Sequence, residues 1–137
     1  MKKDIENRDD IDLLMREFYT VAMKDSVIGY IFTDVAKLDL DHHLPIIGDF
    51  WDSMLFGTNL YSRHARHPMV VHGELHEMSA LDERHFERWL EIFYDAIDRL
   101  FEGPTADLLK MRASAIAGRM MNYLGISDSP LMTLNKQ

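Results

Sequence analysis

Apolar residues recur every three or four positions in four long segments of this 137-residue chain, and this spacing constrains the fold more than any other feature. Such a period places apolar side chains on one face of an α-helix, whereas a half-buried strand alternates apolar and polar residues. No segment sustains that alternation. We therefore predict an all-α protein with four substantial helices and several short ones.

Charged residues and glycines indicate where the first two helices begin and end. The first should begin near Asp9-Asp10, because negative charge favours a helix N-terminus. The second should run from about residue 40 to residue 56 and stop at Gly57. Its wide apolar face suits a helix that packs on two sides.

Similar signals bound the last two helices. Ser79 with Asp82 three residues later is typical of a capping box before the third helix. That helix should stop at Gly103-Pro104. Thr105 should cap the fourth helix, which ends at Gly125.

The length and composition fit one domain. A chain of 137 residues with 47% hydrophobic and 28% charged residues can bury a core and remain in solution. We expect a single domain over residues 1–137, with its core at about 9–125 and loose termini at 1–8 and 127–137.

Charge and the lack of cysteine exclude several functions. The net charge of −8 disfavours nucleic acid as a partner, since an acidic surface repels phosphate. Without cysteine there is no thiolate nucleophile, iron–sulfur cluster or covalently attached haem. The polar N-terminus and the lack of long apolar stretches predict a cytoplasmic protein without a membrane partner.

Four polar or titratable side chains occur on or beside apolar segments. His72 follows the apolar run Met69-Val70-Val71, His43 shares a stripe with large apolar residues, and Tyr19 and Trp89 accompany two other helices. A buried imidazole, phenol or indole needs a hydrogen-bond partner. A polar ligand inside an apolar pocket would supply one.

Haem meets this requirement. Its iron binds a neutral imidazole, and its porphyrin needs aromatic and aliphatic walls. Plain core packing also accounts for each candidate wall residue. The candidates are Phe18, Phe32, Ile46, Ile47, Phe50, Trp51 and Met78.

Two other classes of function stay open at this point. His64, His67, His72 and His76 form two pairs spaced three and four residues apart, which is typical of ligands for zinc, nickel or copper on a helix. Alternatively, the chain is a helical interaction module without a cofactor. Its polar side chains would then satisfy one another inside a closed core.

The order of these residues resembles the truncated haemoglobins, specifically their third group. The similarity covers about residues 9–125, and it depends on order and spacing rather than on one motif. The matching segments are Phe18-Tyr19, Phe32, His43 to Trp51, His72, Phe86 to Leu90 and Arg112 to Ala117.

The resemblance implies a globin-like two-over-two helical sandwich around non-covalent haem b, with His72 as the proximal iron ligand. Tyr19, His43 and Trp89 would line the distal side. His43 would donate a hydrogen bond, gate entry or bind the iron as a sixth ligand. Pro45 indicates that the distal helix begins or kinks near His43.

The implied ligands are diatomic: oxygen, nitric oxide, carbon monoxide and cyanide. Oxygen binding or transport, oxygen-dependent nitric oxide detoxification by a dioxygenase reaction, and peroxidase-like chemistry all fit. Turnover would need an electron donor such as a reductase, since the chain has no flavin or nicotinamide motif.

Overall fold

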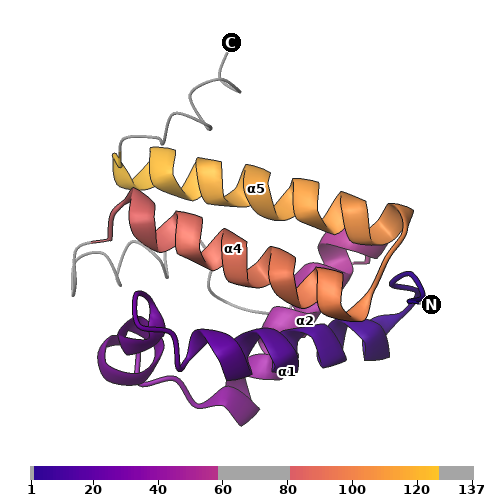
Figure 1. The fold of residues 1–137 in the computed structure, drawn as a ribbon, viewed down its shortest axis with the longest axis horizontal. Coiled ribbons are helices and arrows are strands. Elements are labelled where there is room, and N and C mark those ends of the chain that lie inside the picture. The colour runs from indigo at the N-terminus through magenta and orange to yellow at the C-terminus, as the bar shows by residue number, and fades with distance from the viewer. Residues whose placement is uncertain (1, 59–80, 127–137) are drawn as a thin grey trace.

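The computed structural model of the chain describes residues 2–58 and 81–126, and within them it is helical (Figure 1). No described residue lies in a β-strand, so the prediction of an all-α fold is confirmed. The elements are α1 (Arg8–Ala22), the π-helical turn η1 (Ile31–Val35), α2 (Leu40–Phe56), α4 (Glu83–Leu100) and α5 (Pro104–Leu124).

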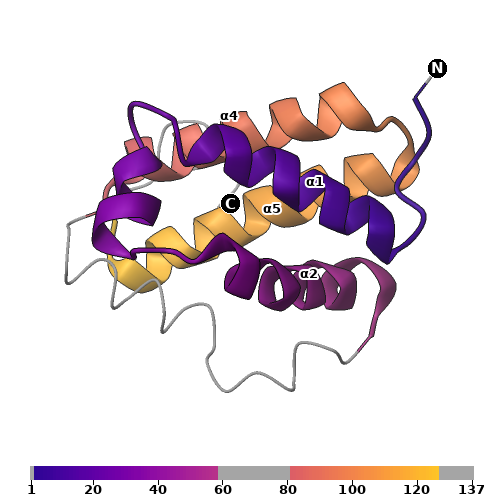
Figure 2. The same ribbon diagram turned by 90° about the horizontal axis from the view of Figure 1, so that it is seen from below.

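The four α-helices form two pairs. Figure 1 shows α4 and α5 as a hairpin of opposite direction, and Figure 2 shows α1 and α2 also running in opposite directions. The pairs meet where α1 packs on α4 and α2 on α5. This arrangement is the two-over-two sandwich that the resemblance implies.

The bounds of the first pair agree closely with the sequence. Helix α1 begins at Arg8, because the side chain of Asn7 accepts a hydrogen bond from the Asp10 N–H at 3.1 Å and caps the helix. Helix α2 ends before Gly57, whose φ of 70° suits a residue without a Cβ. Pro45 suggested that α2 begins or kinks near His43. A start at His43 is wrong, because Asp39 caps the helix and Leu40 is its first residue.

The capping box of α4 lies three residues later than predicted, at Asp82 and His85 instead of Ser79 and Asp82. Asp82 is the N-cap residue, and its side chain accepts from the backbone of Arg84. His85 completes the box, since its Nδ1 accepts from the Asp82 N–H at 2.9 Å. Asp82 therefore begins the capping box instead of ending it, and Ser79 lies outside the described residues.

The cap of α5 comes from the other end of the chain. Thr105 does not cap the helix, because Gly103 is the N-cap residue and Pro104 the first helical residue. The Asp4 carboxylate instead accepts hydrogen bonds from the backbone N–H groups of Thr105 and Ala106, each at 2.9 Å. A contact 101 residues apart in sequence cannot be found from local spacing.

Residues 2–7, here called the N-terminal strap, pack against the turn between α4 and α5. The expectation of a loose terminus is wrong for this segment: Ile5 is only 2% exposed, and the Glu102 N–H donates to the Lys3 carbonyl at 2.9 Å. Gly103, with φ of 145°, leaves the room that Asp4 occupies, since a Cβ there would lie 2.6 Å from the Asp4 Cγ.

Asp4→Ala should lower the free energy of unfolding by about 0.5–2 kcal/mol, the usual effect of losing a helix cap. Burial raises the pKa of Asp4, but backbone hydrogen bonds from Thr105, Ala106 and Ile5 outweigh burial and lower it below its ordinary value. A lowered folded pKa stabilises the fold above about pH 4, and this contribution is lost as the pH falls through the folded pKa. Urea unfolding at several pH values checks this: the difference from wild type should shrink in acid. A difference independent of pH would contradict the capping role.

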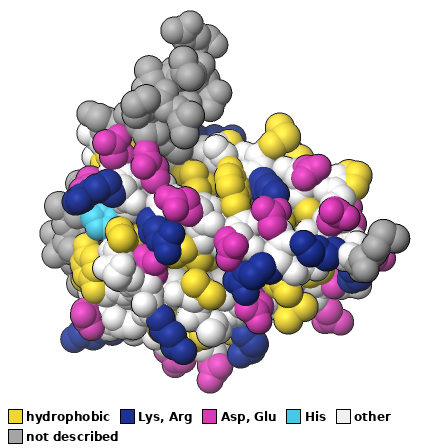
Figure 3. All heavy atoms as spheres, in the orientation of Figure 1, with side chains coloured by type: hydrophobic (Ala, Val, Ile, Leu, Met, Phe, Trp, Pro, Cys, Tyr) yellow, Lys and Arg dark blue, Asp and Glu magenta, His cyan; other side chains and the backbone are white. Residues whose placement is uncertain are grey.

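The core lies between the two helix pairs. Its largest side chains with under 2% exposure include Phe18, Phe93, Ile11, Leu14, Met15, Ile97, Leu109 and Met121. Acidic and basic side chains are interspersed on the face shown in Figure 3. Among the described residues, no helix combines the length and hydropathy needed to cross a lipid bilayer.

Candidate ligand-binding site

A tyrosine–histidine pair joins α1 to α2. The Tyr19 hydroxyl lies 3.0 Å from His43 Nε2, and the two rings meet edge to face with centroids 5.3 Å apart. Tyr19 is only 6% exposed, and burial raises its pKa well above the ordinary value. The phenol is therefore protonated at physiological pH and can donate a hydrogen bond.

Phe32 packs against this pair from η1. Its ring centroid is 5.7 Å from that of Tyr19, again in an edge-to-face arrangement. Phe32 is the second residue of this π-helical turn, which runs from Ile31 to Val35. Single π-helical turns are frequent at functional sites, because they re-aim side chains.

A stack of aromatic rings connects α4 to α2. Phe93 lies between Trp89 and Trp51, with centroid distances of 5.1 Å and 5.2 Å. Phe18 contacts Phe93 edge to face at 5.3 Å. These rings hold the three helices that carry Tyr19, His43 and Trp89 in fixed positions.

Trp89 is one ring away from the tyrosine–histidine pair. Phe18 separates them, with centroids 6.0 Å from Trp89 and 5.0 Å from Tyr19. Trp89 is half-buried, and no residue that the structure describes accepts a hydrogen bond from its indole N–H. The structure thus joins Tyr19 to His43 directly and places Trp89 one ring away from them.

The predicted apolar wall divides into two parts. Phe18 and Trp51 are fully buried in the core. Ile46, Ile47 and Phe50, on α2, are only half-buried.

His72, the predicted iron ligand, lies outside the described residues, as do Met78, His64, His67 and His76. Within residues 2–58 and 81–126, no three His, Cys, Asp or Glu side chains are placed to hold a metal ion. The described part of the chain thus contains the predicted distal residues but not the predicted proximal one.

Sequence reasoning missed an arginine that crosses from α1 to α2. Arg8 Nη1 donates to Asp49 Oδ1 at 2.7 Å, and its Nη2 donates to the Pro45 carbonyl at 3.2 Å. The signal in the sequence is Gly48, a glycine in a helix interior, where it costs stability unless something approaches closely.

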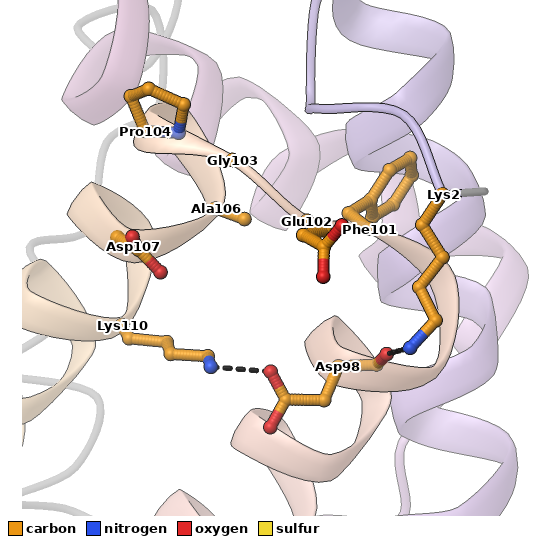
Figure 4. Close-up of a pocket in the computed structure, with 9 residues that line it drawn as sticks. All are labelled: Lys2, Asp98, Phe101, Glu102, Gly103, Pro104, Ala106, Asp107 and Lys110. Carbon is orange, nitrogen blue, oxygen red and sulfur yellow. Dashed lines mark hydrogen bonds and ion pairs between the residues drawn. The ribbon is translucent and has the colours of Figure 1, made fainter.

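A surface depression lies apart from these residues. It is formed where the N-terminal strap meets α4 and α5, and Figure 4 shows Lys2 and Lys110 both directed at Asp98. Both lysines bond to Asp98, Lys2 at the backbone carbonyl and Lys110 at the carboxylate. None of the residues that line it belongs to the stack of aromatic rings described above.

Comparisons with known proteins point to one kind of relative. A group 3 truncated haemoglobin of Campylobacter jejuni is 28% identical over 127 residues, which cover 90% of this chain and 95% of the relative. A crystal structure of a group III truncated haemoglobin from the same organism matches with a TM-score of 0.77, at 28% identity and the same coverage of each chain. No family model matches the chain.

Proposed function

We propose that this chain, which resembles the group 3 truncated haemoglobins in both sequence and fold, binds haem and reversibly binds diatomic ligands, oxygen first. His72 is the proposed protein ligand of the iron. The haem is of the b type, held without a covalent bond, since the chain has no cysteine to attach it.

The observation that carries this proposal is the hydrogen-bonded Tyr19–His43 pair beside apolar side chains that are only partly buried. A closed core would bury its aromatic and aliphatic side chains fully, but Phe32, which packs on Tyr19, and Ile47 and Phe50 on α2 are only half-buried. A flat apolar group with a polar centre fits such surroundings. The described residues therefore fit the distal side of a haem pocket.

Tyr19 and His43 determine which proton faces the ligand. A histidine-ligated haem iron supplies one open coordination position for a diatomic ligand. If His43 Nε2 carries the proton, it donates to the Tyr19 oxygen, and the phenol proton is then free to point to the ligand. A chain of two hydrogen bonds also polarises the phenol and strengthens its donation.

Trp89 supplies a second donor. An indole N–H can only donate, so it stabilises a ligand that carries negative charge. Its stack on Phe93 fixes the plane of the indole ring. Phe18 contacts both rings, so the indole lies one ring away from Tyr19.

The polar distal side also supports redox chemistry. Storage of oxygen needs few polar groups, whereas Tyr19, His43 and Trp89 together provide two donors and a titratable imidazole. Nitric oxide detoxification with oxygen, or a peroxidase-like reaction, would use such groups. Either activity needs electrons from a separate reductase, because the chain carries no flavin or nicotinamide motif.

Absorption spectroscopy of the purified protein tests this proposal. Expressed with sufficient haem, the protein should show a haem spectrum that shifts between the ferric, ferrous, oxygen-bound and carbon monoxide-bound forms. A folded, colourless protein that does not take up haem would contradict the proposal. Metal analysis would then distinguish a histidine-bound metal from a cofactor-free interaction module.

A further inference from the structure

Arg8, the first residue of α1, holds α2 at three of its residues. Besides Asp49 and the Pro45 carbonyl, its Nη1 lies 3.5 Å from Oδ2 of Asp52, a carboxylate that is only 7% exposed. These partners span about two turns of the helix. One planar guanidinium that contacts them all fixes both the rotation of α2 and its position along its axis.

Gly48 is the residue that lets the guanidinium lie on α2. A Cβ at this position would be 2.6 Å from Arg8 Nη2 and 2.9 Å from Arg8 Nε, and 2.8 Å from an oxygen of Asp12, which itself pairs with Arg8. Two independent features of α2 thus fit the guanidinium of Arg8: the acceptors that it offers, and the room left by the lack of a side chain at Gly48.

The turn that carries His43 depends on contacts outside its own helix. Pro45 has no N–H, so the backbone hydrogen bond that would join it to Asp41 is missing. His43 lies within this weakened stretch, and Arg8 binds the carbonyl of Pro45 itself. Helix α1 carries both Arg8 and Tyr19, so the same two helices are tied at both points.

We propose that Arg8 is a positioning residue for the ligand-binding side. By holding α2 at Pro45, Asp49 and Asp52, it sets the distance between His43 Nε2 and the Tyr19 hydroxyl. The guanidinium acts through the helix and touches no ligand. The effect of Arg8 on a bound diatomic ligand rests on the proposed function. Its effect on the distance between Tyr19 and His43 does not, because that distance is a property of the polypeptide alone.

Nitrogen NMR of the His43 imidazole tests this directly. The protein is labelled with ¹⁵N and used as purified, reduced under carbon monoxide so that any haem is diamagnetic, and His43→Gln assigns the signals. Arg8→Gln and Gly48→Ala should both shift the His43 signals. Arg8→Lys should shift them less, because a lysine keeps the charge but not the planar fork.

The two main variants differ in their effect on stability. Gly48→Ala improves helix propensity and displaces the guanidinium without removing its charge, so its melting temperature should fall less than that of Arg8→Gln. If the His43 signals shift in both variants although their melting temperatures differ, a loss of stability does not explain the shift. With haem bound, oxygen should dissociate about 2- to 10-fold faster from Arg8→Gln, the effect of one weakened hydrogen bond.

Two controls decide the interpretation. Arg84→Gln removes an exposed arginine that pairs with Asp82 at the start of α4, and Asp4→Ala destabilises the fold at the cap of α5; neither should shift the His43 signals. Unchanged His43 signals in Arg8→Gln and Gly48→Ala, or equal shifts in Asp4→Ala, would overturn the proposal. If the protein carries no haem, the proposed function fails, and the NMR measurement still decides the role of Arg8.

Discussion

Oxygen should leave the ferrous protein about 5- to 150-fold faster when Tyr19 is replaced by phenylalanine. The buried phenol is the donor that the structure places beside His43, and losing a hydrogen bond to a negatively polarised ligand costs about 1–3 kcal/mol. Trp89→Phe should act in the same direction, because it removes the second donor. Stopped-flow measurement of the oxygen dissociation rate checks both variants.

The chain contains a matched control for this experiment. Tyr30 also hydrogen-bonds a histidine, His85 Nε2, at 3.0 Å, but Tyr30 is 37% exposed and its partner His85 lies in the first turn of α4. Tyr30→Phe should leave the oxygen dissociation rate unchanged. Unchanged rates in both Tyr19→Phe and Trp89→Phe would show that the proposed distal hydrogen bonds do not exist.

Phe93→Ala should lower the free energy of unfolding by about 3–5 kcal/mol, the largest stability effect expected in this chain. Phe93 is 1% exposed and stacks with both Trp89 and Trp51, so alanine would leave a cavity between α4 and α2. Urea unfolding measures the loss. Tyr123→Ala, at a side chain that is 58% exposed, should change the stability by less than about 0.5 kcal/mol. A loss below about 1 kcal/mol for Phe93→Ala would contradict the central place of this ring.

Local periodicity was enough to predict the four α-helices that the structure describes. The bounds expected for the second helix, residues 40 and 56, are those of α2, because Gly57 is a left-handed cap that a sequence reveals directly. The resemblance to the third group of truncated haemoglobins is also confirmed, by the relative of known sequence and by the solved structure. This resemblance was based on the order and spacing of a few residues, which can be recognised even at 28% sequence identity.

Contacts between distant segments were not predictable in the same way. Asp4 caps α5 from the opposite end of the chain, so Thr105 looked like the best local cap and the strap looked loose. The contacts of Arg8 with α2 were not predicted for the same reason, since an arginine near the start of a helix is usually a solvated charge. Only Gly48, which is unfavourable inside a helix, hinted that another group approaches there.

The candidate site was predicted in part. The sequence placed Tyr19, His43 and Trp89 on three helices, and the structure brings Tyr19 and His43 within hydrogen-bond distance. It could not show that Phe18 separates Trp89 from this pair, because that depends on how α1 and α4 pack. The role of His72 stays a prediction.

The most direct test of haem binding through His72 is the absorption spectrum of His72→Ala beside that of wild type and of His76→Ala. We predict that wild type and His76→Ala show the same histidine-ligated haem spectrum, with the same shifts on reduction and on adding carbon monoxide. In His72→Ala this spectrum should be lost or grossly altered. A His72→Ala protein with the wild-type spectrum in all these forms would contradict the assignment of His72 as the iron ligand.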